Sequence, residues 1–112
     1  MPDIVASLRV LADATRLRLM ALLAHDELSV NELQEITHMG QSRISTHLGL
    51  LQKHGFLTSR REGKRVFYAL LDLKDGADKS LMEIALKGVN ELEDFESDAI
   101  KLKRILERRE DQ

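Results

Sequence analysis

The spacing of apolar residues changes once along this chain, and that change limits the fold more than any other feature. Up to Gly55 the apolar residues recur at helical intervals of three and four. From Leu57 to Leu70 they alternate with other residues on both sides of Glu62-Gly63-Lys64, which predicts a β-hairpin with glycine at its tip. A polar linker follows, and the chain is helix-forming again from Ser80 to its end. The pattern predicts a mainly α fold with one β-hairpin.

The helical part before Gly55 divides into four helices. The first covers the stretch DIVASLRVLA, and the second follows it directly, with Asp13 or Thr15 as its N-cap. Ser29 with Glu32 three residues later forms a capping box, which predicts the start of a third, short helix. A fourth helix, 41–54, ends at Gly55, where a left-handed stop is expected. Its predicted buried face consists of Ile44, Leu48 and Leu51.

The composition excludes several classes of protein. The chain has no cysteine, so disulfides, thiolate metal sites and thiol catalysis are ruled out. No apolar run reaches the roughly 18 residues of a membrane span, and the N-terminus lacks the basic flank of a signal peptide, so we expect a cytoplasmic protein. The four histidines lack metal-ligand spacing, and no nucleophile is accompanied by a base. We therefore expect no enzymatic activity, no bound metal and no cofactor.

Charge is distributed unevenly along the chain, although the net charge is only −2. Residues 38–68 carry six basic side chains and one acidic side chain, whereas the segments before and after them are net acidic. Phosphate contact requires a local basic surface, because the field at the contact matters more than the total charge. The middle of the chain is therefore the candidate surface for a nucleic-acid partner.

The predicted elements follow the order of a winged helix-turn-helix: helix, short helix, tight turn, helix and basic hairpin. In that arrangement the fourth helix, 41–54, enters the major groove, and the wing, 58–68, lies on flanking backbone or in the minor groove. The candidate DNA-binding residues are Gln41, Ser42, Arg43, Ser45, Thr46 and His47 on the helix and Arg60, Arg61, Lys64 and Arg65 on the wing. Two alternatives stay open: Gln41 or Ser42 serves only as a helix cap, and the wing cations only solubilise an exposed strand.

The C-terminal segment carries a coiled-coil pattern. Its apolar seam has steps of four and three residues and runs through Leu81, Ala85, Gly88, Leu92, Phe95, Ala99, Leu102 and Leu106. A single helix of that length would span about 39 Å. The seam packs either on the chain's own first helices or on a second copy, and its length favours the second copy. A break at Glu96-Ser97-Asp98, giving two helices, is the remaining alternative.

Four stretches, LADATRLRLMALL, ELSVNELQE, QSRISTHLGLLQKHGFL and REGKRVFYAL, resemble the ArsR/SmtB family of bacterial winged-helix repressors. The resemblance implies a DNA-binding domain at 1–75 and a dimerisation helix within 76–112. It also implies a homodimer that represses transcription by binding a palindromic operator in double-stranded DNA, and release of the operator by an effector. The implied dimer contacts are Leu8, Leu81, Ala85, Leu92 and Phe95.

The chain departs from the metal-sensing members of that family. Where metalloid sensors carry cysteines it has Ser29 and Asn31, and its final segment lacks histidine. These departures disfavour metal effectors and leave a small molecule or a protein open as the effector. The stretch DAIKLKRILERREDQ also resembles, more weakly, the segment that leads into an S-adenosylmethionine-dependent methyltransferase in fusion members. The alternative function is therefore a dimerisation or regulatory module of a fused methyltransferase, with little DNA binding of its own.

Overall fold

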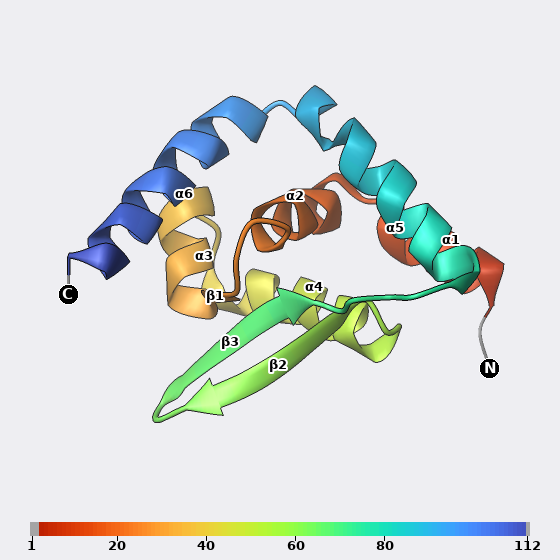
Figure 1. Ribbon diagram of the computed structural model, residues 1–112, viewed down its shortest axis with the longest axis horizontal. Helices are drawn as coiled ribbons and strands as arrows, with labels where there is room; N and C mark the ends of the chain where they lie inside the picture. The colour runs from red at the N-terminus through yellow and green to blue at the C-terminus, as the bar shows by residue number, and fades with distance from the viewer. Residues whose placement is uncertain (1–2, 112) are drawn as a thin grey trace.

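A computed structural model describes residues 3–111, so the outermost residues of the two predicted regions, 1–75 and 76–112, lie outside the described residues. Figure 1 shows the order of the elements along the chain. They are α1 (Ile4–Leu11), α2 (Ala14–Leu23), β1 (Leu28–Ser29), α3 (Val30–Thr37), α4 (Gln41–Lys53), β2 (Leu57–Glu62), β3 (Arg65–Leu70), α5 (Gly76–Gly88), the 3₁₀ helix η1 (Val89–Glu91) and α6 (Phe95–Glu110). The predicted fold class, mainly helical with a winged helix-turn-helix, is confirmed.

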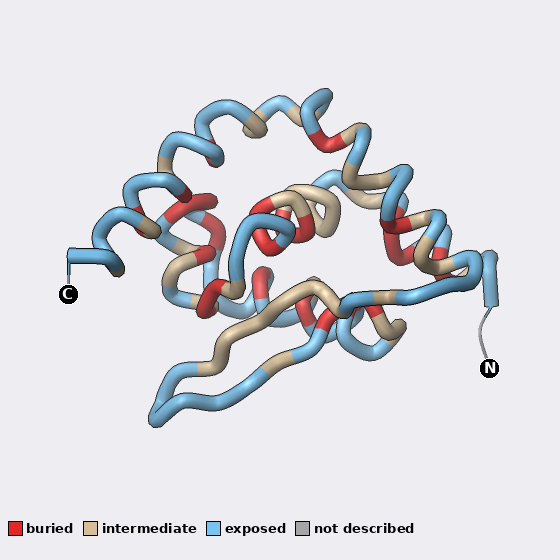
Figure 2. The backbone as a smooth tube through the Cα atoms, viewed as in Figure 1, coloured by how far each residue is buried: buried red, intermediate tan, exposed pale blue. Residues whose placement is uncertain are grey.

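Helix α2 lies at the centre of the molecule. Figure 1 shows α5 and α6 arching over one side of it, with α4 and the β2–β3 hairpin on the other side. Leu19 and Met20 of α2 have no exposed surface, and neither do Ile44 and Leu48 of α4. All four belong to one apolar core, and Figure 2 shows its buried segments on the faces that the helices turn inward.

The local signals for helix ends are confirmed. Asp13 is the N-cap of α2, and its carboxylate accepts the N–H of Arg16 at 2.9 Å, so the alternative cap Thr15 is wrong. The hydroxyl of Ser29 accepts the N–H of Glu32 at 3.2 Å, and the carboxylate of Glu32 accepts the N–H of Ser29 at 3.0 Å. Beyond α4, Gly55 has a φ of +83°, a conformation that glycine adopts without steric cost.

The hairpin belongs to a three-stranded antiparallel sheet with the order β1-β3-β2. The sequence does not predict β1, which pairs Leu28 with Tyr68 and Ser29 with Phe67. A strand of two residues is too short to show an alternating pattern, so its pairing follows from the position of α3 and not from a local signal. The added strand fixes the base of the hairpin to the start of α3.

The prediction of one continuous C-terminal helix from Ser80 is wrong. The helix begins earlier, at Gly76, and α5 ends at Gly88. The chain then passes through η1 and an extended residue, Leu92, before α6 starts at Phe95. The helix-breaking tendency of glycine accounts for the end of α5. The alternative, two helices separated by a break near residues 96–98, is correct in that two helices form, but the break lies a few residues earlier.

Much of the apolar seam packs on the chain itself. Leu102 is buried in the core, and Leu81 and Leu106 pack against the core from α5 and α6. The interpretation that the seam covers the chain's own helices therefore holds for these three residues. Because α5 and α6 are separate helices, the seam does not form one straight stripe.

An ion pair fastens α6 to the start of α3. Arg109 donates through Nε to a carboxylate oxygen of Glu32 at 2.9 Å and through Nη2 to the carbonyl of Glu27 at 3.0 Å. Burial raises the pKa of Glu32, but hydrogen bonds from Arg109 and Ser29, together with the charge of Arg109, outweigh it, so the net pKa is lowered. Glu32 thus caps α3 and anchors α6.

Replacement of Ile44 tests the packing of α4. Ile44→Ala should lower the free energy of unfolding by about 2–5 kcal/mol, because it leaves a cavity at a fully buried position. Leu50→Ala is the control on the same helix, where the side chain is 37% exposed, and should cost about 1 kcal/mol or less. Urea denaturation followed by circular dichroism measures both, and equal losses would contradict the burial described here.

The lowered pKa of Glu32 predicts acid sensitivity. A carboxylate with a depressed folded-state pKa contributes stability above its ordinary pKa of 4.5 and loses that contribution as the pH falls through the folded-state value. Glu32→Gln keeps the capping geometry but removes the charge, so its unfolding free energy should fall less below pH 4.5 than that of the wild type. Glu107→Gln on α6 is the control for charge removal, because Glu107 is exposed and forms no salt bridge with another described residue. Parallel acid limbs in wild type and Glu32→Gln would refute the prediction.

Candidate nucleic-acid interface

Helix α4 separates an apolar face from a polar face, as its sequence predicts. The apolar face is fully buried and consists of Ile44, Leu48 and Leu51. The exposed residues of its first turns are Gln41, Ser42, Arg43, Ser45 and Thr46. Gly40 is the N-cap, and among the described residues no side chain makes a capping hydrogen bond there. The alternative role of Gln41 or Ser42 as a helix cap is therefore wrong.

Some of these polar side chains already have partners. Arg43 donates through Nη2 to the hydroxyl of Thr15 at 3.0 Å, and Nδ1 of the half-buried His47 lies 3.1 Å from Nη1 of Arg16. The hydroxyl of Thr46 donates to the backbone carbonyl one turn earlier, at 2.9 Å. Within residues 3–111, no side-chain hydrogen bond is made by Gln41, Ser42 or Ser45. These three side chains are the ones that are free to bind another molecule without first breaking a contact.

The wing projects from the body of the molecule beside α4 (Figure 1). Its two strands pair from Leu57 with Leu70 to Glu62 with Arg65, and Gly63 at the turn has a φ of +63°. Arg61, Lys64 and Arg65 are exposed, and none of them forms a salt bridge with another described residue. A cluster of three uncompensated cations therefore surrounds the tip of the wing.

Arg60 differs from the other wing cations because it is paired within the chain. It donates through Nε to Glu27 at 2.9 Å and through Nη1 to Glu62 at 2.7 Å, and its guanidinium lies 4.8 Å from the centre of the Phe67 ring. The hydrogen bond from Arg60 lowers the pKa of Glu27. Since alternate residues of a strand point to opposite faces, Arg60 and Arg61 lie on different sides of the sheet. The structure thus places Arg60 on the face toward Glu27 and Phe67, and Arg61 on the opposite face. Arg65, which pairs with Glu62, lies on the face of Arg60 but at the tip of the wing, beside Lys64.

Two of these contacts were missed at the sequence level. The Arg60–Phe67 contact had a signal, because residues equidistant from a two-residue turn lie opposite one another on one face of a hairpin. The contact between Arg16 and His47 had none, since the residues are 31 positions apart and lie on different helices.

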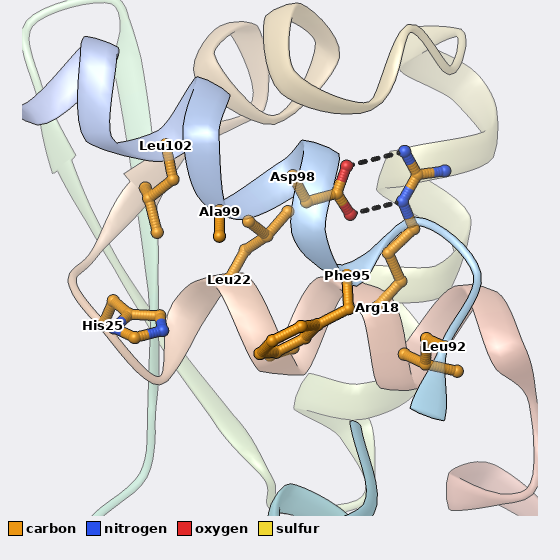
Figure 3. Close-up of a pocket in the computed structure, with 9 residues that line it drawn as sticks. Arg18, Leu22, His25, Leu92, Phe95, Asp98, Ala99 and Leu102 are labelled. Carbon is orange, nitrogen blue, oxygen red and sulfur yellow. Dashed lines mark hydrogen bonds and ion pairs between the residues drawn. The ribbon is translucent and has the colours of Figure 1, made fainter. Parts of the chain in front are cut away.

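A small pocket lies between α2 and α6, with a buried ion pair at its edge (Figure 3). Asp98 is only 4% exposed and accepts from Nε of Arg18 at 2.7 Å and from Nη2 at 2.9 Å. Hydrogen bonding to Asp98 raises the pKa of Arg18, so the guanidinium stays charged. The apolar lining comprises Ala21, Leu22, Leu92, Phe95, Ala99 and Leu102. The predicted dimer contacts Leu92 and Phe95 therefore face α2 of the same chain.

The other predicted dimer contacts lie near α1 and α5, which pack against each other. Leu8 is 47% exposed, and Ala85 is half-buried. Three neighbouring or facing apolar side chains are also exposed: Ile4, Val5 and Ile84. Leu81, by contrast, packs against the core of its own chain. Three exposed large apolar side chains thus lie together on α1, with Ile84 on α5, while Leu50 on α4 and Ile100 on α6 are also exposed.

Two further observations concern metals and membranes. Within residues 3–111, no three histidine, aspartate or glutamate side chains are grouped in a way that suits a metal ion. No described helix has both the length and the apolar character that a membrane crossing requires.

Residues 13–59 match the family of bacterial regulatory proteins described as the arsR family. The chain is 38% identical over 66 residues to the transcriptional activator HlyU of Vibrio cholerae, an alignment that covers 59% of this chain and 61% of that protein. It is 38% identical over 72 residues to the biofilm growth-associated repressor of Agrobacterium fabrum, with 64% of this chain and 62% of that protein covered. The chain thus spans about three fifths of the length of these curated relatives.

Solved structures share the fold as well. The HlyU structure from Vibrio cholerae superimposes with a TM-score of 0.63 at 32% identity, covering 75% of this chain and 88% of that one. The transcriptional repressor BigR from Xylella fastidiosa gives a TM-score of 0.63 at 30% identity, with coverage of 75% and 80%. Each of these matches covers three quarters of this chain. The chain therefore belongs to the arsR family of bacterial regulatory proteins.

Proposed function

We propose that this protein is a sequence-specific DNA-binding transcriptional repressor that acts as a homodimer. The observation that carries the proposal is the division of α4 into a fully buried apolar face and an exposed face of small polar and basic side chains. A helix held in this way presents hydrogen-bonding groups to the base edges of the major groove. The wing cations lie on the same segment and supply contacts to the phosphate backbone.

The individual roles follow from which groups are free. Base contacts are assigned to the free side chains Gln41, Ser42 and Ser45. They are also assigned to Arg43, which would exchange its hydrogen bond to Thr15 for one to a base, while Thr46 and His47 lie at the margin of this surface. Phosphate contacts are assigned to the three uncompensated wing cations, Arg61, Lys64 and Arg65. Arg60 contributes less, because Glu27 and Glu62 neutralise it.

The names of the relatives support a regulator and favour repression. The relative from Agrobacterium fabrum is a repressor by name, as is the solved BigR, whereas HlyU is named an activator. Because the chain has no cysteine, an effector held by thiolates is unsuitable. We propose a small molecule or a partner protein as the effector, and the cytoplasm, where DNA is accessible, as the site of action.

The proposed dimer interface is built from α1 and from α5, which lies in the predicted dimerisation region 76–112. Leu8 and Ala85 lie at its surface with the exposed Ile4, Val5 and Ile84, and a second copy would remove this apolar area from water. Leu81 packs against the core of its own chain, and Leu92 and Phe95 line the pocket between α2 and α6. Two recognition helices in such a dimer contact half-sites of a palindromic operator about 34–36 Å apart.

The alternative function, a regulatory module of a fused methyltransferase, has no support in these comparisons. The segment that suggested it, residues 98–109, has structural roles instead. Asp98 pairs with Arg18 of α2, Leu102 and Ile105 are buried, and Arg109 pairs with Glu32.

Replacement of Arg43 tests base recognition. Arg43→Ala should weaken binding to the operator by about 1–3 kcal/mol and relax the preference at one position in each half-site. Binding to random duplex should change much less. The measurement is a competition titration against a library of single-base operator variants. Equal losses on operator and random duplex would refute the base contact.

Because the wing cations differ in how far they are neutralised, they should contribute unequally to the salt dependence of DNA binding. Lys64→Ala should weaken binding to all sequences alike and reduce the slope of log affinity against log salt by about 1. Arg60→Ala is the matched control, because its charge is already neutralised by Glu27 and Glu62, and its slope should stay closer to that of the wild type. A larger slope change for Arg60→Ala than for Lys64→Ala would contradict the division of the wing cations.

A further inference from the structure

The first turn of α2 touches the exposed face of α4 at two points. Thr15 accepts a hydrogen bond from Arg43, and Arg16 approaches the imidazole of His47. Arg43 and His47 are four residues apart, so they lie on the same side of α4. Contacts with α2 therefore fix the conformations of these two side chains of the recognition helix.

The guanidinium of Arg16 is fixed in position from several directions. Its Nε donates to the carbonyl of Val10 at 2.5 Å, and its Nη2 donates to the carbonyl of Arg9 at 3.2 Å, both near the end of α1. Its Nη1 lies 3.9 Å from a carboxylate oxygen of Asp13, and the side chain is only 14% exposed. The nitrogen that meets His47 is thus presented by a rigid group.

Because arginine only donates hydrogen bonds, its contact with His47 determines which imidazole nitrogen carries the hydrogen. A guanidinium has five N–H donors and no acceptor, and it keeps its proton in proteins. The 3.1 Å contact between Nη1 and Nδ1 is therefore a hydrogen bond only when Nδ1 accepts. An imidazole with an accepting Nδ1 is neutral and carries its hydrogen on Nε2. Within residues 3–111, Nε2 of His47 makes no hydrogen bond, so this N–H remains available.

We propose that Arg16 is a positioning residue that holds His47 in the Nε2–H tautomer, so that this N–H donates to a phosphate oxygen of the DNA backbone. The proposal rests on the proposed function for its DNA partner. The partner is a phosphate because the N-terminal residues of a recognition helix contact the base edges, whereas His47 lies on the second turn of α4, on the side next to α2. A ring with its hydrogen on Nδ1 would meet the guanidinium donor to donor and present an acceptor to the phosphate.

The tautomer is measured directly, without DNA, by long-range proton–nitrogen correlation NMR of the full chain. The wild type should show a non-protonated Nδ1 and a protonated Nε2 at His47. Arg16→Gln should give a mixture of tautomers, because an amide offers both a donor and an acceptor. Arg9→Gln, the same change at an exposed residue of α1, should leave the wild-type pattern. Hydrogen on Nδ1 in the wild type, or an unchanged pattern in folded Arg16→Gln, would overturn the positioning role.

The phosphate contact is tested separately with variants of His47 on a duplex, which also covers the case in which Arg16→Gln does not fold. His47→Ala should bind about tenfold more weakly with a nearly unchanged salt slope, because a neutral imidazole that donates to a phosphate releases no counterion. His47→Gln, whose amide reaches toward the position of Nε2, should recover part of the loss, and His47→Asn, which reaches only as far as Nδ1, should not. Equal binding by Gln and Asn variants would overturn the contact. Absence of any DNA binding by the wild type would overturn the proposed function, while the NMR result would still decide the tautomer.

Discussion

The packing of α2 against α4 is the contact on which the rest of the structure depends. Leu19 and Met20 on α2 and Ile44 and Leu48 on α4 are completely removed from water and share one core. Because a helix has a period of 3.6 residues, fixing one face of α4 inward forces the residues between to face outward. The exposure of Gln41, Ser42, Arg43, Ser45 and Thr46 is therefore a consequence of core packing.

Charged pairs connect the outer elements to this central unit. Arg18 and Asp98 join α2 to α6, Arg109 joins α6 to α3, and Arg60 joins the wing to the loop before β1 through Glu27. In the basic middle segment, Arg60 is neutralised by Glu27, which precedes the segment, and by Glu62 within it. The cations left uncompensated are concentrated at the tip of the wing, where a phosphate backbone would approach without having to break an existing ion pair.

Local signals account for the parts of the fold that the sequence predicted. The capping box at Ser29, the stop at Gly55 and the alternation around Gly63 each depend on residues within a few positions, and α4 and the hairpin were placed correctly for that reason. Strand β1, the break between α5 and α6 and the partners of Arg60 depend on distant residues. The candidate site followed the same division: the exposure of the polar α4 residues could be predicted, whereas the contacts that hold Arg43 and His47 could not.

Specific recognition of DNA is the central claim, and fluorescence anisotropy measures it most directly. The full chain is titrated onto a labelled duplex from its own promoter region and onto a random duplex of equal length, over a series of salt concentrations. The account predicts an affinity for the promoter about 10³-fold or more above that for random sequence, with both affinities falling steeply as salt rises. Equal and weak affinities for the two duplexes would contradict it.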